Sequence, residues 1–290
     1  MAELDWHGER ADLPGIALLD REPAADEIDM SAVRAYRLGR VRAEMRRRGI
    51  AACLLSDPVN IRYASGTRNM QVFTSRNQPA RYLVVTERDC ILHEFRGCAH
   101  LAQGIETVSE VREAMTASYV AAGEDIAERE RRWAAATASD LRALVGPGAT
   151  IGVERLNAGA TAALSAEGFR LVDAQAPVER ARAIKSREEM KCVRASLAAT
   201  ERGVGRLRAA IRPGLTEQAL WSVLHQSIIE DGGDYIETRL LNAGERTNPW
   251  FQETSARVIE PGELIALDTD VAGCFGYYSD FSRTFHAGPD

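Results

Sequence analysis

Residues 268–285 read DTDVAGCFGYYSDFSRTF and hold three aspartates, Asp268, Asp270 and Asp280, in sequence that is otherwise typical of β-strand. Residues two apart on a strand share a face, so Asp268 and Asp270 point to the same side. A partner strand that returns across a hairpin brings Asp280 back towards them. The segment therefore predicts an antiparallel strand pair with three converging carboxylates.

Three converging carboxylates repel one another unless protons, arginines or a hard cation neutralise them. Carboxylate oxygens suit Mg, Mn and Ca and, together with histidine, Fe, Co or Zn. Two metal ions that share carboxylates could activate a water or polarise a substrate carboxylate. The alternative is an aspartate that serves the turn, with Asp280 paired to Arg283 on a solvated edge. The spacing leaves both interpretations open.

The bulk composition is that of a soluble globular protein. The chain has 290 residues, of which 45% are hydrophobic and 27% charged, and a net charge of −6. This balance predicts no nucleic-acid partner, and no apolar run is long enough to cross a membrane. The N-terminus lacks an apolar signal region, and the five cysteines are scattered. These features predict a cytoplasmic protein with reduced thiols.

The chain divides by pattern into three parts. Residues 1–30 are polar, without periodicity, and are expected to form a tail. Helix and strand patterns alternate over residues 31–180, which is typical of an α/β domain. Within it, IAACLLSD reads as a buried strand, PVNIRYASG as a turn and residues 123–145 as a long charged helix.

Residues 181–290 have a different order. A long amphipathic helical region over residues 178–211 stops at Pro213 and Gly214, and a second helix starts at Thr216. Strand patterns follow in YIETRLLNAG, through ARVIEPG, and in ELIALDTD and GYYSDFSRTF. Helices followed by an antiparallel sheet are an α+β arrangement.

The aspartate segment resembles the first metal-ligand hairpin of the creatinase/aminopeptidase, or pita-bread, metalloenzymes. That family includes methionine aminopeptidase, Xaa-Pro peptidases and creatinase. The segments RAIKSREEM, PGLTEQAL and DPVNIRYASG are also similar to the family, so the resemblance covers most of residues 31–290. It implies an α/β N-terminal domain followed by an α+β pita-bread catalytic domain that is incomplete at its C-terminus.

One branch of the family is more similar than the others. GGDYIETRLLNAGERTNPWFQE, residues 232–253, and the LDTD form resemble the dimethylsulfoniopropionate (DMSP) lyase branch, DddP. The resemblance implies that Asp268, Asp270 and Asp280 are metal ligands, with Asp280 bridging two divalent ions. Iron is favoured, with Mn, Co or Zn as alternatives. The implied reaction is the β-elimination of DMSP to dimethyl sulfide and acrylate.

The predicted substrate is a small sulfonium cation. Xaa-Pro peptidases place a histidine just before this hairpin, whereas this chain has Trp250 and Phe251 in ERTNPWFQE. The two rings could form an aromatic wall against the cation, because a ring face attracts positive charge. The alternative is that Trp250 is ordinary core. Tyr63, in NIRYASG, is a further candidate that could face the substrate pocket of a neighbouring subunit or simply pack the first domain.

The family completes its site with one histidine and two glutamates downstream of this hairpin. The elimination base of the lyase branch is expected downstream of Asp290 as well. We therefore expect the chain to be a fragment that binds metal weakly and does not turn over. The resemblance also implies a homodimer. The competing functions are an Xaa-Pro peptidase and a non-catalytic binding protein of the same fold.

Overall fold

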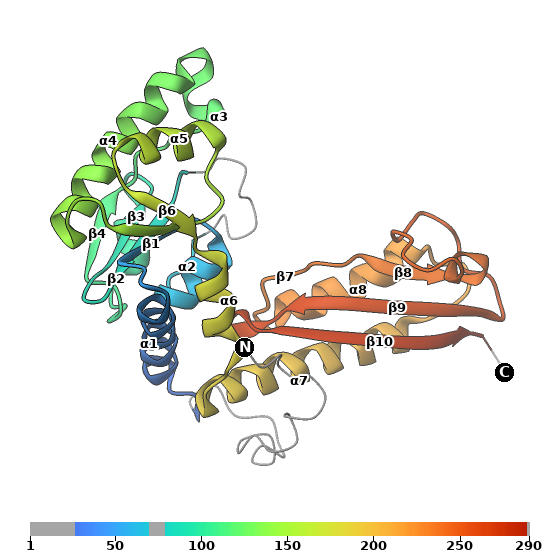
Figure 1. The fold of residues 1–290 in the computed structure, drawn as a ribbon. Coiled ribbons are helices and arrows are strands. Elements are labelled where there is room, and N and C mark those ends of the chain that lie inside the picture. The colour runs from blue at the N-terminus through green and yellow to red at the C-terminus, as the bar shows by residue number, and fades with distance from the viewer. Residues whose placement is uncertain (1–26, 70–78, 289–290) are drawn as a thin grey trace. The chain divides into compact units, whose positions relative to one another are not determined.

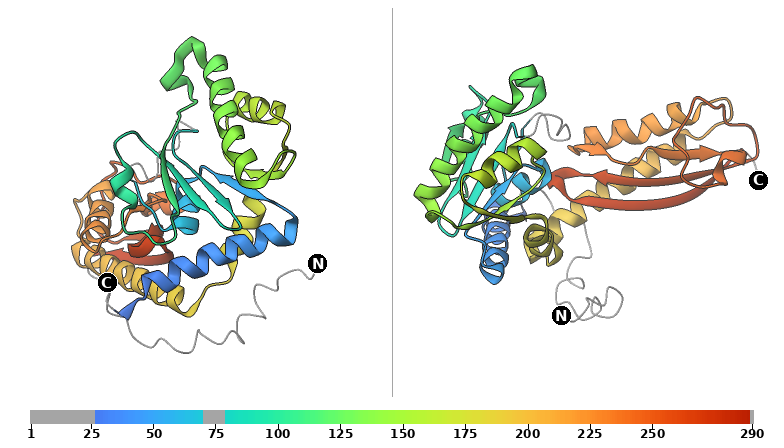
Figure 2. Two further views of the ribbon diagram at one scale, coloured as in Figure 1. Left: turned by 90° about the vertical axis from the view of Figure 1, so that its left-hand side faces the viewer. Right: turned by 45° about the horizontal axis from the view of Figure 1, so that its top comes forward.

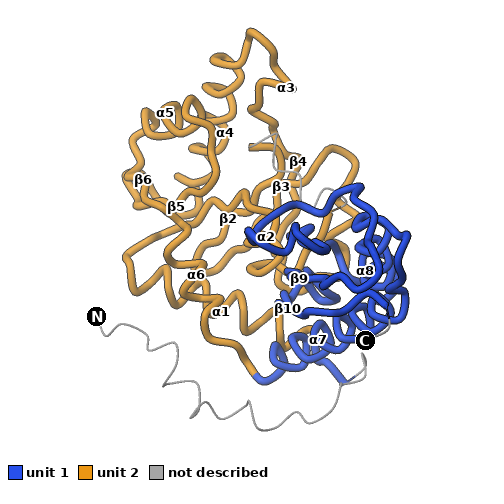
Figure 3. The backbone as a smooth tube through the Cα atoms, turned by 90° about the vertical axis from the view of Figure 1, so that its right-hand side faces the viewer, with its two compact units in different colours: residues 1–29, 187–290 blue, residues 30–186 orange. Residues whose placement is uncertain are grey.

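The computed structural model describes residues 27–69 and 79–288, which fall into two compact units (Figure 3). Residues 30–186 form the first unit in chain order, which is orange in Figure 3 and labelled unit 2 there. Residues 187–288, with the short stretch 27–29, form the second unit, which is blue and labelled unit 1. Most of the tail predicted over residues 1–30 lies outside the described residues.

The first unit is built on a six-stranded mixed sheet with the order β4-β3-β2-β1-β5-β6. Its strands are β1 (Ala52–Leu55), β2 (Tyr82–Thr86), β3 (Cys90–Glu94), β4 (Glu110–Glu113), β5 (Thr150–Val153) and β6 (Arg170–Asp173). β1, β5 and β6 are parallel to one another, whereas β2 is antiparallel to both of its neighbours, β1 and β3. The central strands β1, β2 and β3 are buried along their whole length, as expected for strands that are covered on both faces.

Helices cover both faces of this sheet (Figures 1 and 2). α1 (Met30–Arg48), α2 (Pro58–Ser65) and α6 (Gln175–Ala183) contribute to one core, and α4 (Ile126–Val145) and α5 (Ala158–Ala166) contribute to the other. Strand β1 shows the division residue by residue, because Cys53 and Leu55 face the first core while Ala52 and Leu54 face the second. The alternation of side chains along a strand thus builds two cores from one continuous apolar run.

The segment PVNIRYASG is a helix, so its prediction as a turn was wrong. Asp57 caps α2, because its Oδ1 accepts a hydrogen bond from the Val59 N–H at 2.8 Å. Pro58 occupies the first helical turn, where its missing N–H costs nothing, and Gly66 ends the helix at a φ of 82°. The proline and glycine that suggested a turn are here the two ends of a short helix. The remaining short elements of the unit are α3 (Tyr119–Ala122), η3 (Ala99–Ala102) and η4 (Gly123–Asp125).

The second unit packs two helices against an antiparallel sheet. α7 (Arg187–Ala210) and α8 (Glu217–Glu230) lie along the long strands in Figure 1. The sheet has the order β10-β9-β7, with β8 also paired to β9, and contains β7 (Tyr235–Ile236), β8 (Leu240–Ala243), β9 (Glu263–Ala272) and β10 (Tyr278–Ala287). Its core combines apolar residues of both helices with the inward residues of β9, such as Ile265 and Leu267.

Three expectations for this unit need correction. The helical region predicted from Val178 to Ile211 is two helices, α6 and α7, separated by residues 184–186, and the predicted boundary at residue 180 falls inside α6. The strand YIETRLLNAG is split into β7 and β8. In ARVIEPG, Val258 forms only an isolated bridge with Thr216. Two short 3-10 turns complete the unit, η5 (Gly244–Thr247) and η6 (Cys274–Gly276). Among the described helices, none has the length and apolarity that a membrane span requires.

Candidate metal and substrate site

The hairpin of β9 and β10 places the three aspartates on one face of the sheet. Asp280 lies directly opposite Asp270, and Asp268 lies opposite Ser282. The intervening residues Leu267 and Thr269 are buried on the other face, which packs on the helices. The strict alternation along the hairpin therefore separates an acidic face from a core face. We use the name acid face for the side that carries the three aspartates.

The acid face raises the proton affinity of Asp280. The pKa of Asp280 is raised, first by partial burial and then by the charges of Asp270 and Asp268. Asp268 accepts a hydrogen bond from the Ser282 hydroxyl at 2.7 Å, and Asp270 accepts one from the Thr238 hydroxyl at 3.1 Å. These neutral donors orient two carboxylates without neutralising them.

The alternative ion pair between Asp280 and Arg283 is not formed. Residues 280 and 283 have opposite parity on β10, so their side chains leave opposite faces of the sheet. The Arg283 guanidinium lies 5.1 Å from the centre of the Phe281 ring and donates to the Ser282 carbonyl oxygen. In the part of the chain that the structure describes, no arginine or lysine forms an ion pair with any of the three aspartates.

The three aspartates fit a divalent metal by chemistry. Uncompensated carboxylate oxygens on one face are the donors that hard divalent cations prefer. Within residues 27–69 and 79–288, no three His, Cys, Asp or Glu side chains are arranged as a group that could hold an ion. The assignment of Asp268, Asp270 and Asp280 as metal ligands therefore stays a prediction.

Two tyrosines on the acid face were not predicted from the sequence. Tyr235 on β7 and Tyr278 on β10 both pair with Ala272, from opposite sides. Glu237 donates its N–H to the Asp270 carbonyl oxygen at 2.8 Å and so lies beside the acids. The pKa of Tyr278 is raised by burial and by hydrogen bonds with Tyr235 and Glu237. The register could have indicated Tyr278, which shares the parity of Asp280, but the pairing of Tyr235 with Ala272 has no signal in the sequence.

The loop between β8 and β9 carries the predicted aromatic wall. The ring centres of Trp250 and Phe251 are 6.3 Å apart at an angle of 64°, and Phe251 is 79% exposed. Phe251 adopts a φ of 66°, which is uncommon for an aromatic residue. An exposed ring is available to a ligand, and the role of both residues in substrate binding stays a prediction.

The side chain of Glu217 links this loop to strand β8 through hydrogen bonds. Its fully buried carboxylate accepts hydrogen bonds from the Ala243 N–H at 2.9 Å and from the Ser255 N–H at 2.9 Å. It also accepts from the Ser255 hydroxyl at 2.7 Å and pairs with Arg246 at 3.2 Å. One carboxylate at the start of α8 thus holds strand β8 and both ends of the aromatic loop. Its sequence position inside a helix start gave no signal of this role.

Tyr63 belongs to the first compact unit. It is 7% exposed, its hydroxyl donates to the Ala181 carbonyl oxygen at 2.9 Å, and the Arg37 guanidinium lies 5.6 Å from its ring centre. These contacts join α2 to α6 and α1. Its predicted role at a substrate site remains a prediction.

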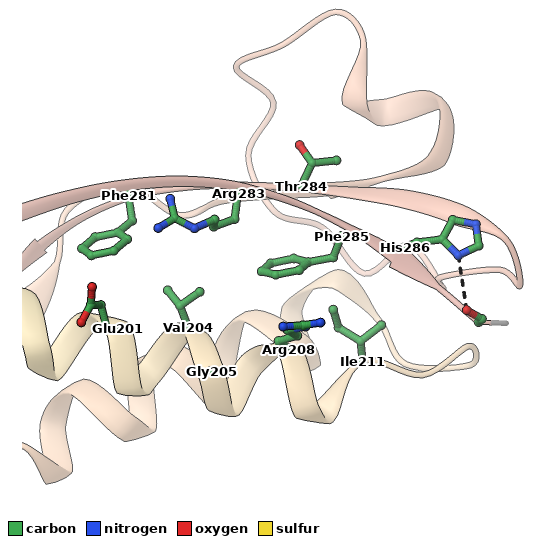
Figure 4. A pocket seen from close by; sticks show the side chains of 11 residues that line it. Glu201, Val204, Gly205, Arg208, Ile211, Phe281, Arg283, Thr284, Phe285 and His286 are labelled. Atoms are coloured by element: carbon green, nitrogen blue, oxygen red, sulfur yellow. Dashed lines mark hydrogen bonds between the residues drawn. The ribbon is translucent and has the colours of Figure 1, made fainter. Parts of the chain in front are cut away.

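A separate hollow lies on the core face of the sheet. It has a volume of about 830 Å³ and lies between α7 and β10. In Figure 4, Phe281, Phe285 and Arg208 line it, while Thr284 points away from α7. Because Phe281 and Phe285 leave the opposite face from Asp280, this hollow is distinct from the acid face.

Comparisons with known proteins define the class. The Creatinase/Prolidase N-terminal domain model matches residues 37–184, and the model of metallopeptidase family M24 matches residues 191–290. The chain belongs to the creatinase/prolidase family of M24 metalloenzymes. The predicted family and the predicted fold class are thereby confirmed.

Two curated relatives of the chain are DMSP lyases. The DMSP lyase DddP of Roseobacter denitrificans is 31% identical over 99% of this chain and 62% of its own length. DddP of Roseovarius nubinhibens is 32% identical over 90% of this chain and 59% of its own length. The chain is thus close to DddP, and it spans about three fifths of the length of these curated relatives.

Solved structures of the family share the fold. The X-Pro aminopeptidase of Thermotoga maritima has a TM-score of 0.66 at 19% identity, covering 87% of this chain and 65% of its own. A dipeptidase of Pyrococcus horikoshii has a TM-score of 0.68 at 21% identity, covering 87% and 66%. These likenesses extend to the fold alone.

Proposed function

We propose that this chain works in a metal-dependent carbon–sulfur lyase that cleaves DMSP to dimethyl sulfide and acrylate. The observation that carries the proposal is the acid face, with three carboxylates that no basic side chain of the described residues neutralises, in a chain 31% identical to a DMSP lyase. DMSP has a carboxylate, which divalent ions held by the three aspartates would attract, and a sulfonium cation, which suits aromatic side chains.

Asp268, Asp270 and Asp280 would hold two divalent ions in this proposal, with iron favoured over Mn, Co or Zn. The bound ions would polarise the substrate carboxylate and make the neighbouring C–H bond more acidic. The Thr238 and Ser282 hydroxyls would keep Asp270 and Asp268 oriented, as partners behind metal ligands commonly do.

The atoms and electrons of the proposed elimination are accounted for as follows. A base removes the proton from the carbon α to the carboxylate, and the electrons of that C–H bond form the C=C bond of acrylate. The C–S bond breaks at the same time, and its electron pair leaves with dimethyl sulfide. The resemblance places the base downstream of Asp290, so none of the described residues is assigned this role.

The test compares two reactions on the product of the complete reading frame. Protein reconstituted with ferrous iron is incubated with DMSP, and headspace dimethyl sulfide is measured by gas chromatography. A parallel sample receives an Xaa-Pro dipeptide, and free amino acid is measured. Dimethyl sulfide release that is lost in Asp270→Asn supports the proposal, with Glu260→Gln, an exposed carboxylate away from the acid face, as the control.

The other outcomes assign the alternatives. Amino-acid release without dimethyl sulfide would show that the peptidase activity of the structural relatives is retained. The loop ERTNPWFQE counts against this outcome, because it lacks the histidine that Xaa-Pro peptidases place there. Neither product, together with metal binding, would favour a non-catalytic protein. We also expect the protein to be a homodimer and to be located in the cytoplasm. Sedimentation of the purified protein tests the expected dimer.

A further inference from the structure

Two tyrosines and one glutamate form a compact group beside the aspartates on the acid face. Tyr235 and Tyr278 stand on either side of Ala272, the small residue with which both of them pair. The side chains of Tyr235 and Glu237 lie close enough to Tyr278 to raise the pKa of its hydroxyl. We use the name tyrosine pair for Tyr235 and Tyr278.

The tyrosine pair lies one cross-strand row from the carboxylates. Asp270 and Asp280 form one row with Glu237, and Ala272 forms the next row with the tyrosine pair. Rows two residues apart on a strand are separated by about 7 Å. A ligand whose two ends are a short chain apart can therefore touch both rows at once.

DMSP has the two ends that this arrangement requires. Its carboxylate is separated from the sulfonium sulfur by two carbon atoms. We propose that the tyrosine pair and Glu237 bind the sulfonium end of the substrate, while the carboxylate end lies at the aspartate row. This inference rests on the proposed function and assigns the sulfonium to the tyrosine pair instead of to the predicted aromatic wall of Trp250 and Phe251.

The chemistry of the three side chains suits an onium ion. A sulfonium carries methyl groups and no N–H, so it cannot be held by hydrogen bonds. Aromatic faces attract such cations, as the aromatic cages for quaternary ammonium groups do. Tyr278 is 37% exposed, so a ligand can reach it, and the exposed Glu237 supplies the opposite charge.

The alternative is that the tyrosine pair has only a structural role and stabilises this end of the hairpin. The two possibilities differ in what they predict for Tyr278→Phe. A structural pair held by its hydroxyls loses stability when the hydroxyl is removed. A cation site keeps most of its affinity, because the ring face remains.

The experiment measures binding of trimethylsulfonium, a probe that carries the cation without the carboxylate, by NMR titration of the purified protein. We expect Tyr278→Leu and Tyr235→Leu each to weaken binding about tenfold, and Tyr278→Phe to change it by less than about threefold. Glu237→Gln, at an exposed position that tolerates the change, is expected to weaken binding several-fold with no change in thermal unfolding.

A second measurement uses the substrate and its neutral analogue. In active protein, Tyr278→Leu is expected to raise the KM for DMSP about tenfold. The inhibition constant of 4-methylpentanoate, which keeps the carboxylate and replaces the sulfonium by an uncharged branch, is expected to stay the same. Equal losses for both ligands would indicate a general disruption of the site and would overturn the inference.

The outcomes separate this inference from the proposed function. Trimethylsulfonium binding that is absent in the natural protein, or unchanged in the leucine and Glu237→Gln variants, overturns the tyrosine-pair site even if dimethyl sulfide is released. Binding that depends on these residues without any dimethyl sulfide release refutes the lyase function and leaves an onium-binding site.

Discussion

At the scale of single residues, the placement of Asp270 and Asp280 lowers the stability of strand pairing but suits the binding of a metal ion. They lie directly opposite on neighbouring strands, where like charges destabilise the pairing. The same closeness is what a bridged metal site requires. The metal-free protein therefore bears a cost that a bound cation removes.

Replacing Asp280 by asparagine should consequently stabilise the metal-free protein and weaken metal binding. We expect a gain of about 0.5 kcal/mol in the free energy of unfolding in EDTA, because one like-charge contact is removed. Manganese should stabilise the natural protein, and it should stabilise the variant far less. Thermal unfolding with and without the ion measures both effects. A variant that is less stable in EDTA than the natural protein contradicts the repulsion described for this pair.

Glu154 is a second carboxylate with an unusual environment, in the first unit. It is 7% exposed and accepts hydrogen bonds from the N–H groups of Ser56 and Asp57 and from the Asn60 amide at 2.8–3.1 Å. The pKa of Glu154 is raised to about 7, first by burial and also by the charge of Asp57. The hydrogen bonds oppose this shift, but burial dominates.

This pKa sets a pH dependence of stability. Between about pH 4.5 and pH 7 the folded protein keeps a proton that the unfolded chain releases, so the free energy of unfolding falls as the pH rises through this window. The expected loss is roughly 3 kcal/mol. Glu154→Gln should remove this slope. Urea unfolding of both proteins at pH 5 and pH 7.5 measures this slope. An equal change in the free energy of unfolding for the two proteins would count against the titration of Glu154.

Within the elements, the turn of the hairpin depends on a close approach to helix α7. A Cβ atom at Gly273 would lie 2.0 Å from the Ser196 Oγ and 3.2 Å from its Cα. The same hydroxyl donates to the Tyr277 carbonyl oxygen at 2.7 Å. The helix therefore holds the end of the hairpin in place through this serine.

Gly273→Ala is expected to destabilise the second unit by about 2 kcal/mol, because the added methyl group must displace Ser196. Gly205→Ala is the matched control on α7. A Cβ there meets no atom within 4 Å, so the change should stabilise the helix by about 0.5–1 kcal/mol. Urea unfolding of the two variants tests the pair, and equal effects would mean that the turn is not held by this contact.

The start of α8 provides the other fixed point of this unit. Glu217→Ala should cost about 3 kcal/mol or more, because it leaves the Arg246 Nε and two backbone N–H groups without their acceptor. Thr216→Ala, which removes only the helix cap to the Ala219 N–H, should cost about 1 kcal/mol. Thermal unfolding measures both. Similar losses for the two variants would show that Glu217 acts only as part of the cap.

Local patterns predicted the elements better than they predicted the site. The apolar alternation of ELIALDTD and the parity of the acids are contained in one hairpin, so the sequence alone was enough to place them on one face. The tyrosine pair and Glu217 depend on contacts between residues far apart in the chain. Helix α2 was missed because proline and glycine mark both turns and helix ends.

Across the whole molecule, each compact unit has its own core. The two cores of the first unit draw only on residues between Leu38 and Ala181, and the core of the second draws only on residues from Val204 onwards. The matched family models divide the chain in the same way, at residues 37–184 and 191–290.

Residues 30–186 should therefore fold when expressed alone. We expect a helical and strand-rich circular dichroism spectrum and a single cooperative thermal transition, since no core residue of this unit is lost. The fluorescence of Trp133, which is fully buried in the second core of this unit, should shift to longer wavelength in the same transition. A spectrum typical of an unfolded chain would show that the unit depends on the rest of the protein.

The two-faced hairpin also bears on how such a protein can change over evolutionary time. Residues of one parity on β9 hold the strand to the helices, and residues of the other parity carry the acids and their neighbours. A substitution at Tyr278 or Asp270 alters what the face can bind while leaving Leu267 and Val271 in their packing. New chemistry can therefore be tried on one side of the sheet without risk to folding, which offers a physical route by which one scaffold comes to serve both hydrolysis and elimination.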